Sequence, residues 1–108
     1  MPTKIVRLAT DDWIEAWFAD AYKDYMFSIS GTITAVKIYY KITAWGTNWA
    51  GQPSDELIEV YYNRYLVARH EHVFMGVSVE GFPDVTDKYA SGTNTITIHV
   101  GLASFGFV

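Results

Sequence analysis

Cysteine is absent from this sequence of 108 residues, which excludes disulfide bonds, thiolate catalysis and cysteine-ligated zinc. Basic residues are few as well: eight lysines and arginines stand against twelve acidic residues, for a formal net charge of −4. A protein that binds the phosphate backbone of DNA or RNA needs a concentration of positive charge. We therefore expect no nucleic-acid partner.

Long apolar runs are also missing. No stretch approaches the roughly 18 apolar residues of a membrane-spanning helix, and the start, MPTKIVR, lacks the apolar region of a secretory signal. No serine lies in a nucleophile elbow, and the sequence has no glycine-rich phosphate loop. We expect a protein without a membrane span or a signal peptide, and one that is not an enzyme.

Aromatic side chains, by contrast, are abundant: eight tyrosines, six phenylalanines and four tryptophans make up 17% of the chain. Half of all residues are hydrophobic, which is enough for one core, and no linker or repeat divides the sequence. We therefore predict a single domain over residues 1–108. A domain of this size cannot bury every aromatic ring, so some are expected on its surface.

Most of the sequence predicts β-strands, because β-branched and aromatic residues recur in alternation. These segments are residues 4–8, 25–29, 33–45, 58–62, 74–79 and 95–100, with a return strand that begins at residue 66. In the longest of them, Val36, Ile38, Tyr40 and Ile42 are expected on one face. The fold class that follows is all-β.

A short helix is expected near the N-terminus. Trp13, Ile14, Trp17 and Phe18 are spaced for one helical face, and residues 10–12 offer a helix cap in front of them. A strand is the alternative for the same segment.

Three motifs occur in order within residues 58–100: IEVYYNRYLVARHE, PDVTDKY and SGTNTITIHV. Together they resemble the galactose-binding-like jelly roll, in particular the N-terminal non-catalytic sandwich domain of family 2 glycoside hydrolases. That family carries V-x-x-N-G-x-x-V-x-x-H-x-G, then D-V-T, then G-x-N-x-I-x-V. The matching positions here are Val60, Asn63, Val67, His70, Asp84, Val85, Thr86, Gly92, Asn94, Ile96, Ile98 and Val100. The resemblance implies an antiparallel jelly-roll-like β-sandwich, and a non-catalytic one, because the active site of those enzymes lies on another domain.

One departure from the family pattern concerns the hairpin turn. Arg64 stands where the family has glycine after the asparagine. A type I′ turn needs positive φ at both central residues, which asparagine tolerates and arginine does not favour. We therefore expect a longer or bulged turn through Tyr65.

Candidate metal ligands are few. His70 and His72 are expected on one face of an extended chain, a spacing that can hold zinc, copper or nickel, but no third ligand is near in sequence. We therefore expect no transition-metal site. The resemblance also implies a structural calcium ion near Asp84 and Asp87. The simpler account is a polar turn whose side chains cap backbone amides, so we expect no cofactor, with a structural calcium ion as the alternative.

The loop at residues 46–55 offers chemistry for sugar binding. Trp45 and Trp49 can stack on the apolar face of a sugar, while Asn48 and Gln52 can bond to its hydroxyl groups. The alternative is structural, with Trp45 at the end of a core strand and Trp49 folded over the edge of the sandwich.

The last eight residues, GLASFGFV, are almost wholly apolar. Such a segment is a poor free end in water, so we expect it to complete a strand, either in its own sheet or in that of a neighbouring chain. In the second case, Leu102, Phe105, Phe107 and Val108 form an interface between chains.

The function expected from these features is that of a non-catalytic structural or adhesive subunit, with copies of itself or other assembly proteins as partners. A virion capsid, tail or decoration protein and an extracellular filament are the assemblies that fit. The alternative is a carbohydrate-binding module that recognises glycans through its loop aromatics.

Overall fold

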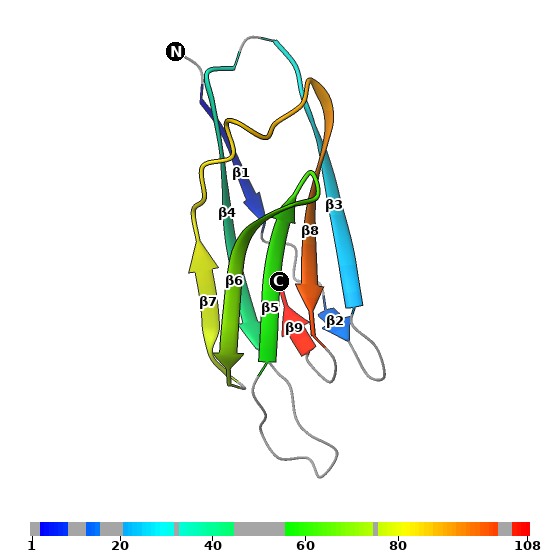
Figure 1. Cartoon of the computed structure of the whole chain (residues 1–108), viewed down its shortest axis with the longest axis vertical. Coiled ribbons are helices and arrows are strands. Elements are labelled where there is room, and N and C mark those ends of the chain that lie inside the picture. Colours follow the sequence, from blue (N-terminus) through cyan, green and yellow to red (C-terminus); the bar gives the residue numbers. More distant parts are fainter. Residues whose placement is uncertain are drawn as a thin grey trace.

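The computed structural model describes residues 3–8, 13–15, 21–31, 33–44, 56–74, 76–101 and 105–108. These residues form nine strands and no helix. The strands make two sheets that run along the long axis of the molecule and stack as a β-sandwich (Figure 1). The described part of the chain therefore confirms the all-β fold class.

The first sheet has four strands in the order β3-β8-β5-β6, and every neighbouring pair is antiparallel. Its strands are β3 (Ala21–Ile29), β8 (Gly92–Val100), β5 (Glu56–Tyr62) and β6 (Tyr65–Val73).

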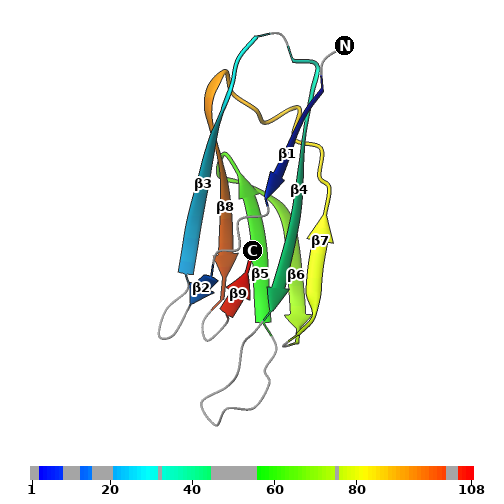
Figure 2. The same ribbon diagram turned by 180° about the vertical axis from the view of Figure 1, so that it is seen from behind.

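The second sheet has five strands in the order β1-β4-β9-β2, with β7 paired to β4 as well. They are β1 (Thr3–Leu8), β4 (Ala35–Ala44), β9 (Phe105–Phe107), β2 (Trp13–Glu15) and β7 (Ser78–Gly81). Seen from behind, β7 lies on one side of β4, and β1 and β9 lie on the other (Figure 2). The β1–β4 pair is parallel, which departs from the expected antiparallel arrangement.

The core lies between the sheets and follows the alternation of the strands. The expected face of β4, Val36, Ile38, Tyr40 and Ile42, is at most 2% exposed. Six side chains of the four-stranded sheet form the other half of the core, and each is at most 1% exposed: Ile58, Val60, Tyr62, Ile96, Ile98 and Val100. Burying an aliphatic or aromatic side chain of this size stabilises the fold by roughly 1.5–3 kcal/mol, so this double row supplies most of the driving force.

The N-terminal helix is not found at the residues that the structure describes in this segment. Trp13–Glu15 forms β2, which pairs antiparallel with β9. An isolated helix of one or two turns is marginal in water, whereas pairing with a neighbouring strand satisfies backbone groups at once. The strand alternative therefore holds for these three residues. Trp17 and Phe18 lie outside the described residues.

The strand expected at residues 74–79 is observed only in part. β6 continues to Val73, and β7 begins at Ser78. Between them the Gly76 amide donates to the Ala44 carbonyl at 2.7 Å, and Gly76 has a φ of +85°. The chain turns at this glycine because its backbone adopts a conformation that side chains disfavour.

The hairpin between β5 and β6 turns through two residues. Asn63 and Arg64 have φ values of +46° and +74°, and Tyr62 pairs with Tyr65 across them. Positive φ at both positions defines a type I′ turn, so the expected longer or bulged turn is wrong. The Asn63 side chain holds this geometry: its Oδ1 accepts from the Thr95 amide at 2.9 Å, and its Nδ2 donates to the Lys88 carbonyl at 3.0 Å.

A second asparagine is completely buried and joins the same region. Asn94 Oδ1 accepts from the Tyr62 hydroxyl at 2.7 Å and from Asn63 Nδ2 at 2.9 Å. Its Nδ2 donates to the carbonyl of Ala90 at 2.7 Å. Burial raises the pKa of Tyr62 to about 12, so the tyrosine stays a neutral donor. The asparagines of the first and third motifs thus lock the hairpin onto β8.

The D-V-T motif docks on β4. The Val36 amide donates to Thr86 Oγ1 at 3.0 Å, and the Val85 amide donates to the Val36 carbonyl at 2.8 Å. Asp84 Oδ1 accepts from the Thr86 hydroxyl at 2.5 Å and from the Thr86 amide at 2.9 Å, and these two bonds hold the pKa of this aspartate below its usual value. These contacts match the capping account of this segment, and the calcium ion stays a prediction.

The two candidate metal-binding histidines differ in their surroundings. His70 is half-buried, and its Nε2 lies 2.6 Å from the Tyr40 hydroxyl. Burial lowers the pKa of His70 and raises that of Tyr40, so both groups are neutral in this contact. His72 is exposed and has a φ of +57°. The chain is therefore not extended at His72, contrary to the expectation.

Candidate binding face

A row of four side chains crosses the four-stranded sheet on its outer face, the face turned away from the core. Strand register places Tyr22 of β3 beside His99 of β8, His99 beside Glu59 of β5, and Glu59 beside Arg69 of β6. The alternation of each strand directs these residues outward while their sequence neighbours pack inward.

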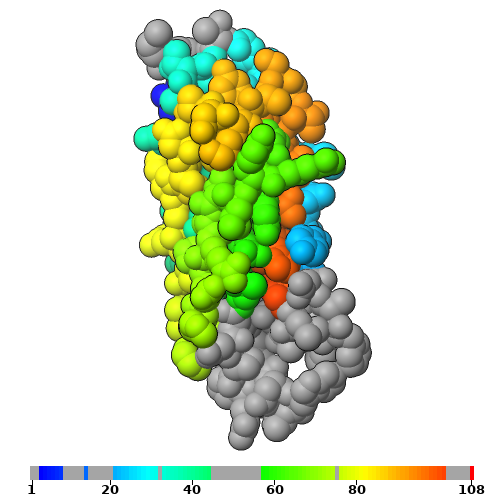
Figure 3. Space-filling model, viewed as in Figure 1, coloured from blue at the N-terminus to red at the C-terminus, as the bar shows by residue number. Residues whose placement is uncertain are grey.

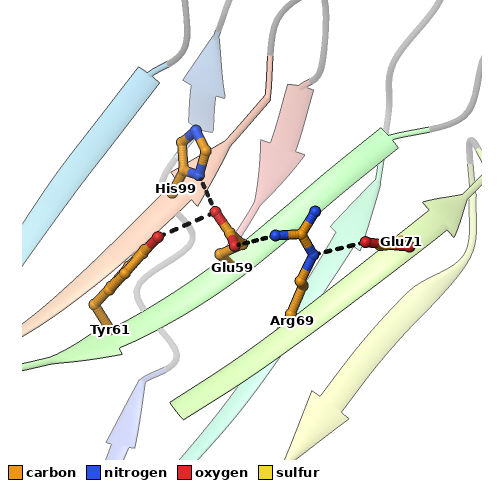
Figure 4. A network of polar contacts seen from close by, with 5 residues as sticks. All are labelled: Glu59, Tyr61, Arg69, Glu71 and His99. Carbon is orange, nitrogen blue, oxygen red and sulfur yellow. Dashed lines mark hydrogen bonds and ion pairs between the residues drawn. The ribbon is translucent and has the colours of Figure 1, made fainter. Parts of the chain in front are cut away.

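Glu59 is the centre of this row, and three donors surround it (Figure 4). Its Oε1 accepts from His99 Nδ1 at 2.6 Å and from the Tyr61 hydroxyl at 3.2 Å, and its Oε2 accepts from Arg69 Nη1 at 3.1 Å. Glu59 and His99 are each only 5% exposed. A carboxylate that is buried to this extent needs such donors, because the loss of water is otherwise costly.

Arg69 also pairs with Glu71, at 2.7 Å from Nε to Oε1, and this bond raises the pKa of the arginine. Burial raises the pKa of the Tyr61 hydroxyl, and its hydrogen bond to Glu59 raises it further. Tyr61 is therefore a neutral donor at physiological pH.

Tyr22 lies flat on the imidazole of His99. The ring centroids are 4.4 Å apart, and the two planes differ by 8°. Tyr22 is nonetheless 62% exposed, so one face of its ring is covered and the rest is open to solvent. Glu59 thereby positions two tyrosines, Tyr61 directly and Tyr22 through His99.

Beside these tyrosines the outer face is hollowed. One depression of about 340 Å³ is lined by Tyr22, Tyr61, Arg64 and Thr97. An adjoining depression of about 280 Å³ is lined by Asp24, Asn63, Arg64, Thr95 and Thr97. Because they share Arg64 and Thr97, we describe the two together as the sheet-face hollow. Figure 3 shows this face, where β8 (orange) lies between β3 (blue) and the β5–β6 hairpin (green).

The opposite outer face, on the five-stranded sheet, carries a different arrangement. The Arg7 guanidinium lies 5.3 Å from the ring centre of Tyr39, and the Lys37 ammonium lies 5.6 Å from that of Phe82. The Tyr39 hydroxyl donates to Glu80 at 2.7 Å, and this bond raises the pKa of Tyr39. Cations of the chain itself accompany these rings, whereas the Tyr22 ring presents an open face.

The residues expected to form a glycan site cannot be compared with this face. Trp45, Asn48, Trp49 and Gln52 all lie outside the described residues, and so does Leu102. Phe105 and Phe107 belong to β9, whose backbone pairs with β2 and β4 of the same chain. Val108 is 5% exposed and belongs to the core. The intramolecular alternative therefore describes the backbone of this strand, and an interface between chains stays a prediction.

Sequence reasoning did not find the row of Tyr22, His99, Glu59 and Arg69. One signal was present: Glu59 and His99 each stand between two aliphatic residues of a predicted strand. Polar residues at such positions normally face solvent. Only the register of four strands shows that these two side chains meet.

Within the described part of the chain, no three histidine, aspartate or glutamate side chains lie together as a group that could hold a metal ion. No helix among those residues is both long and apolar enough to cross a membrane.

The fold and this face define a class of protein: an all-β sandwich with a hollow lined by tyrosines and polar side chains on one sheet. No protein-family model, curated protein or solved structure matches the chain.

Proposed function

We propose that this domain is a non-catalytic adhesive subunit of a larger virion or extracellular assembly, and that it binds glycans through the sheet-face hollow. The observation that carries the proposal is the pair of tyrosines, Tyr22 and Tyr61, held by one buried glutamate beside polar side chains. An aromatic ring stacks on the apolar face of a sugar, and polar groups nearby bond to its hydroxyls.

The proposal includes the fold family. We infer that the sandwich is a galactose-binding-like jelly roll, as the motifs within residues 58–100 suggest. The contacts of Asn63 with Asn94 and of Thr86 with β4 support this inference, because residues from all three motifs fasten the same end of the sandwich. In this proposal the motifs indicate the fold family, and the hollow is the binding site.

A glycan array tests the binding function. The parent protein should bind a subset of immobilised oligosaccharides, and Tyr22→Ala should weaken that binding roughly tenfold or more, as expected for a well-packed aromatic contact. Tyr65→Ala is the matched control, because Tyr65 is 58% exposed and does not line the hollow. Equal losses in the two variants, or no glycan bound by the parent, would contradict the proposal.

A second function, self-assembly through strand edges, is favoured by a separate observation. Among the described strands β7 pairs only with β4, so its other edge is open. Three large apolar residues flank it, Phe74, Val77 and Phe82, with exposures of 53%, 48% and 48%. An open strand edge with apolar side chains around it is a template for pairing with another chain.

A further inference from the structure

We propose that the sheet-face hollow takes a neutral pyranose residue, with its ring on the open face of Tyr22 and two adjacent hydroxyls bonded to Asp24 and Arg64. This inference rests on the proposed glycan-binding function and adds the chemical class of the sugar. It follows from the stacking platform, from a donor and an acceptor that are not bonded to each other, and from the backbone of Arg64.

The stacking platform is fixed before any ligand arrives. His99 covers one face of the Tyr22 ring, and Glu59 holds His99 by a 2.6 Å hydrogen bond. Tyr22 lines the same depression as Tyr61 and Arg64, and it remains 62% exposed. A sugar therefore meets an aromatic surface that needs no rearrangement, which lowers the entropic cost of binding.

Asp24 and Arg64 supply opposite halves of a hydrogen-bonding pair. An ionised carboxylate only accepts, a guanidinium only donates, and a sugar hydroxyl does both. Both residues line one depression, yet Asp24 is bonded to the Thr97 hydroxyl at 2.6 Å, and no ion pair joins it to Arg64. Within the described residues Arg64 makes no hydrogen bond or ion pair at all. Two adjacent hydroxyls would satisfy the acceptor and the donor together.

The charges of the hollow favour a neutral ligand. A sugar carboxylate could pair with Arg64, but it would also meet the exposed carboxylate of Asp24 in the same depression. A cationic amino sugar would face the opposite conflict with Arg64. A neutral pyranose meets neither repulsion. The volumes of about 340 Å³ and 280 Å³ lie at and just below the lower end of the range for ligand sites, which suits one or a few sugar units.

Arg64 occupies a backbone position that suits glycine. Its φ of +74° is unfavourable for a side chain of this kind, and the second position of a type I′ turn strongly prefers glycine. Backbone strain of this kind concentrates at functional sites. Arg64 lines the hollow, and its guanidinium has no partner among the residues that the structure describes, so we assign the strain to a side chain kept for binding.

This assignment makes stability and affinity move in opposite directions. Arg64→Gly should raise the melting temperature of the domain, because it relieves the strained turn, and should lower its affinity for neutral sugars about tenfold or more. Lys41→Ala is the matched control: it removes an exposed cation from the other sheet, and both quantities should stay close to those of the parent. Asp24→Asn should lower the affinity for neutral sugars and should improve the binding of an acidic sugar relative to them.

The probes are the methyl glycosides of glucose, galactose, mannose and glucuronic acid, titrated into the full chain and followed by NMR, alongside the array. We expect Arg64→Gly to lose affinity for the neutral glycosides and to melt at a higher temperature than the parent. Unchanged affinity in that variant overturns the inference. A parent that binds only acidic sugars also overturns it but leaves the glycan-binding function standing. Binding of no sugar by either method removes both.

Discussion

At the scale of single residues, Glu59 shows how one buried carboxylate can orient the side chains around it. It is 5% exposed although it lies on the outer face of the sheet, and it accepts from histidine, tyrosine and arginine side chains. A carboxylate with fewer partners at this position would destabilise the fold. With all three it fixes the orientations of Tyr61 and, through His99, of Tyr22.

Replacing this residue should therefore affect stability and binding together. Glu59→Ala leaves three donors without their acceptor, and we expect a loss of about 1–3 kcal/mol in the free energy of unfolding, measured by urea titration. Sugar affinity should fall as well, because the Tyr22 platform is no longer held.

Glu71→Ala is a control with the same arginine. Arg69 and Glu71 are 51% and 54% exposed at their side chains, so their pair is worth less than about 1 kcal/mol. If Glu59→Ala cost no more than Glu71→Ala, the central role of the buried carboxylate would be wrong.

At the scale of elements, the strands were predictable where the alternation was long and uninterrupted. Val36 to Ile42 in β4 and Ile96 to Val100 in β8 place every second side chain in the hydrophobic core, so a local pattern determines the outcome. The structure of residues 13–15 was not predictable, because three residues carry no usable period and their pairing depends on β9, at least 90 positions away.

The β5–β6 hairpin and the row of Tyr22, His99, Glu59 and Arg69 show the same limit of prediction from local sequence. Arg64 argued against a two-residue turn on local grounds, yet Asn63 is held by Thr95 and Lys88, which lie far along the chain. Glu59 and His99 were visible as polar residues in apolar strands, but their contact depends on the register between β5 and β8. Local preference predicts elements, whereas tertiary contacts decide turns and sites.

The place of β9 leads to a prediction for the end of the chain. β9 pairs with both β2 and β4, and the next residue, Val108, is buried in the core. Deletion of residues 105–108 should destabilise the domain by about 3 kcal/mol or more, seen as a large drop in melting temperature. Val108→Ala should cost only about 2 kcal/mol, from the loss of two buried methyl groups. A truncated chain that melts like the parent but no longer forms oligomers would instead place this strand between chains.

At the scale of the whole molecule, the two outer faces divide the proposed tasks. The four-stranded sheet carries the sheet-face hollow, and the five-stranded sheet carries the open edge of β7. A subunit that binds glycans in an assembly needs one surface for each task, since a contact made over the hollow would block the ligand. The separation of these features onto different sheets is compatible with both functions at once.

Light scattering over a dilution series tests the assembly function. The mass should exceed the 12.2 kDa of a single chain, and Val77→Lys should return it to that value, because a charge beside an open strand edge prevents pairing. Leu66→Lys is the matched control: Leu66 is also 48% exposed but lies at the β5–β6 hairpin of the other sheet, so the oligomer should persist. A parent that stays at 12.2 kDa at every concentration would remove self-assembly through β7 and leave only the proposed glycan binding, which the array tests separately.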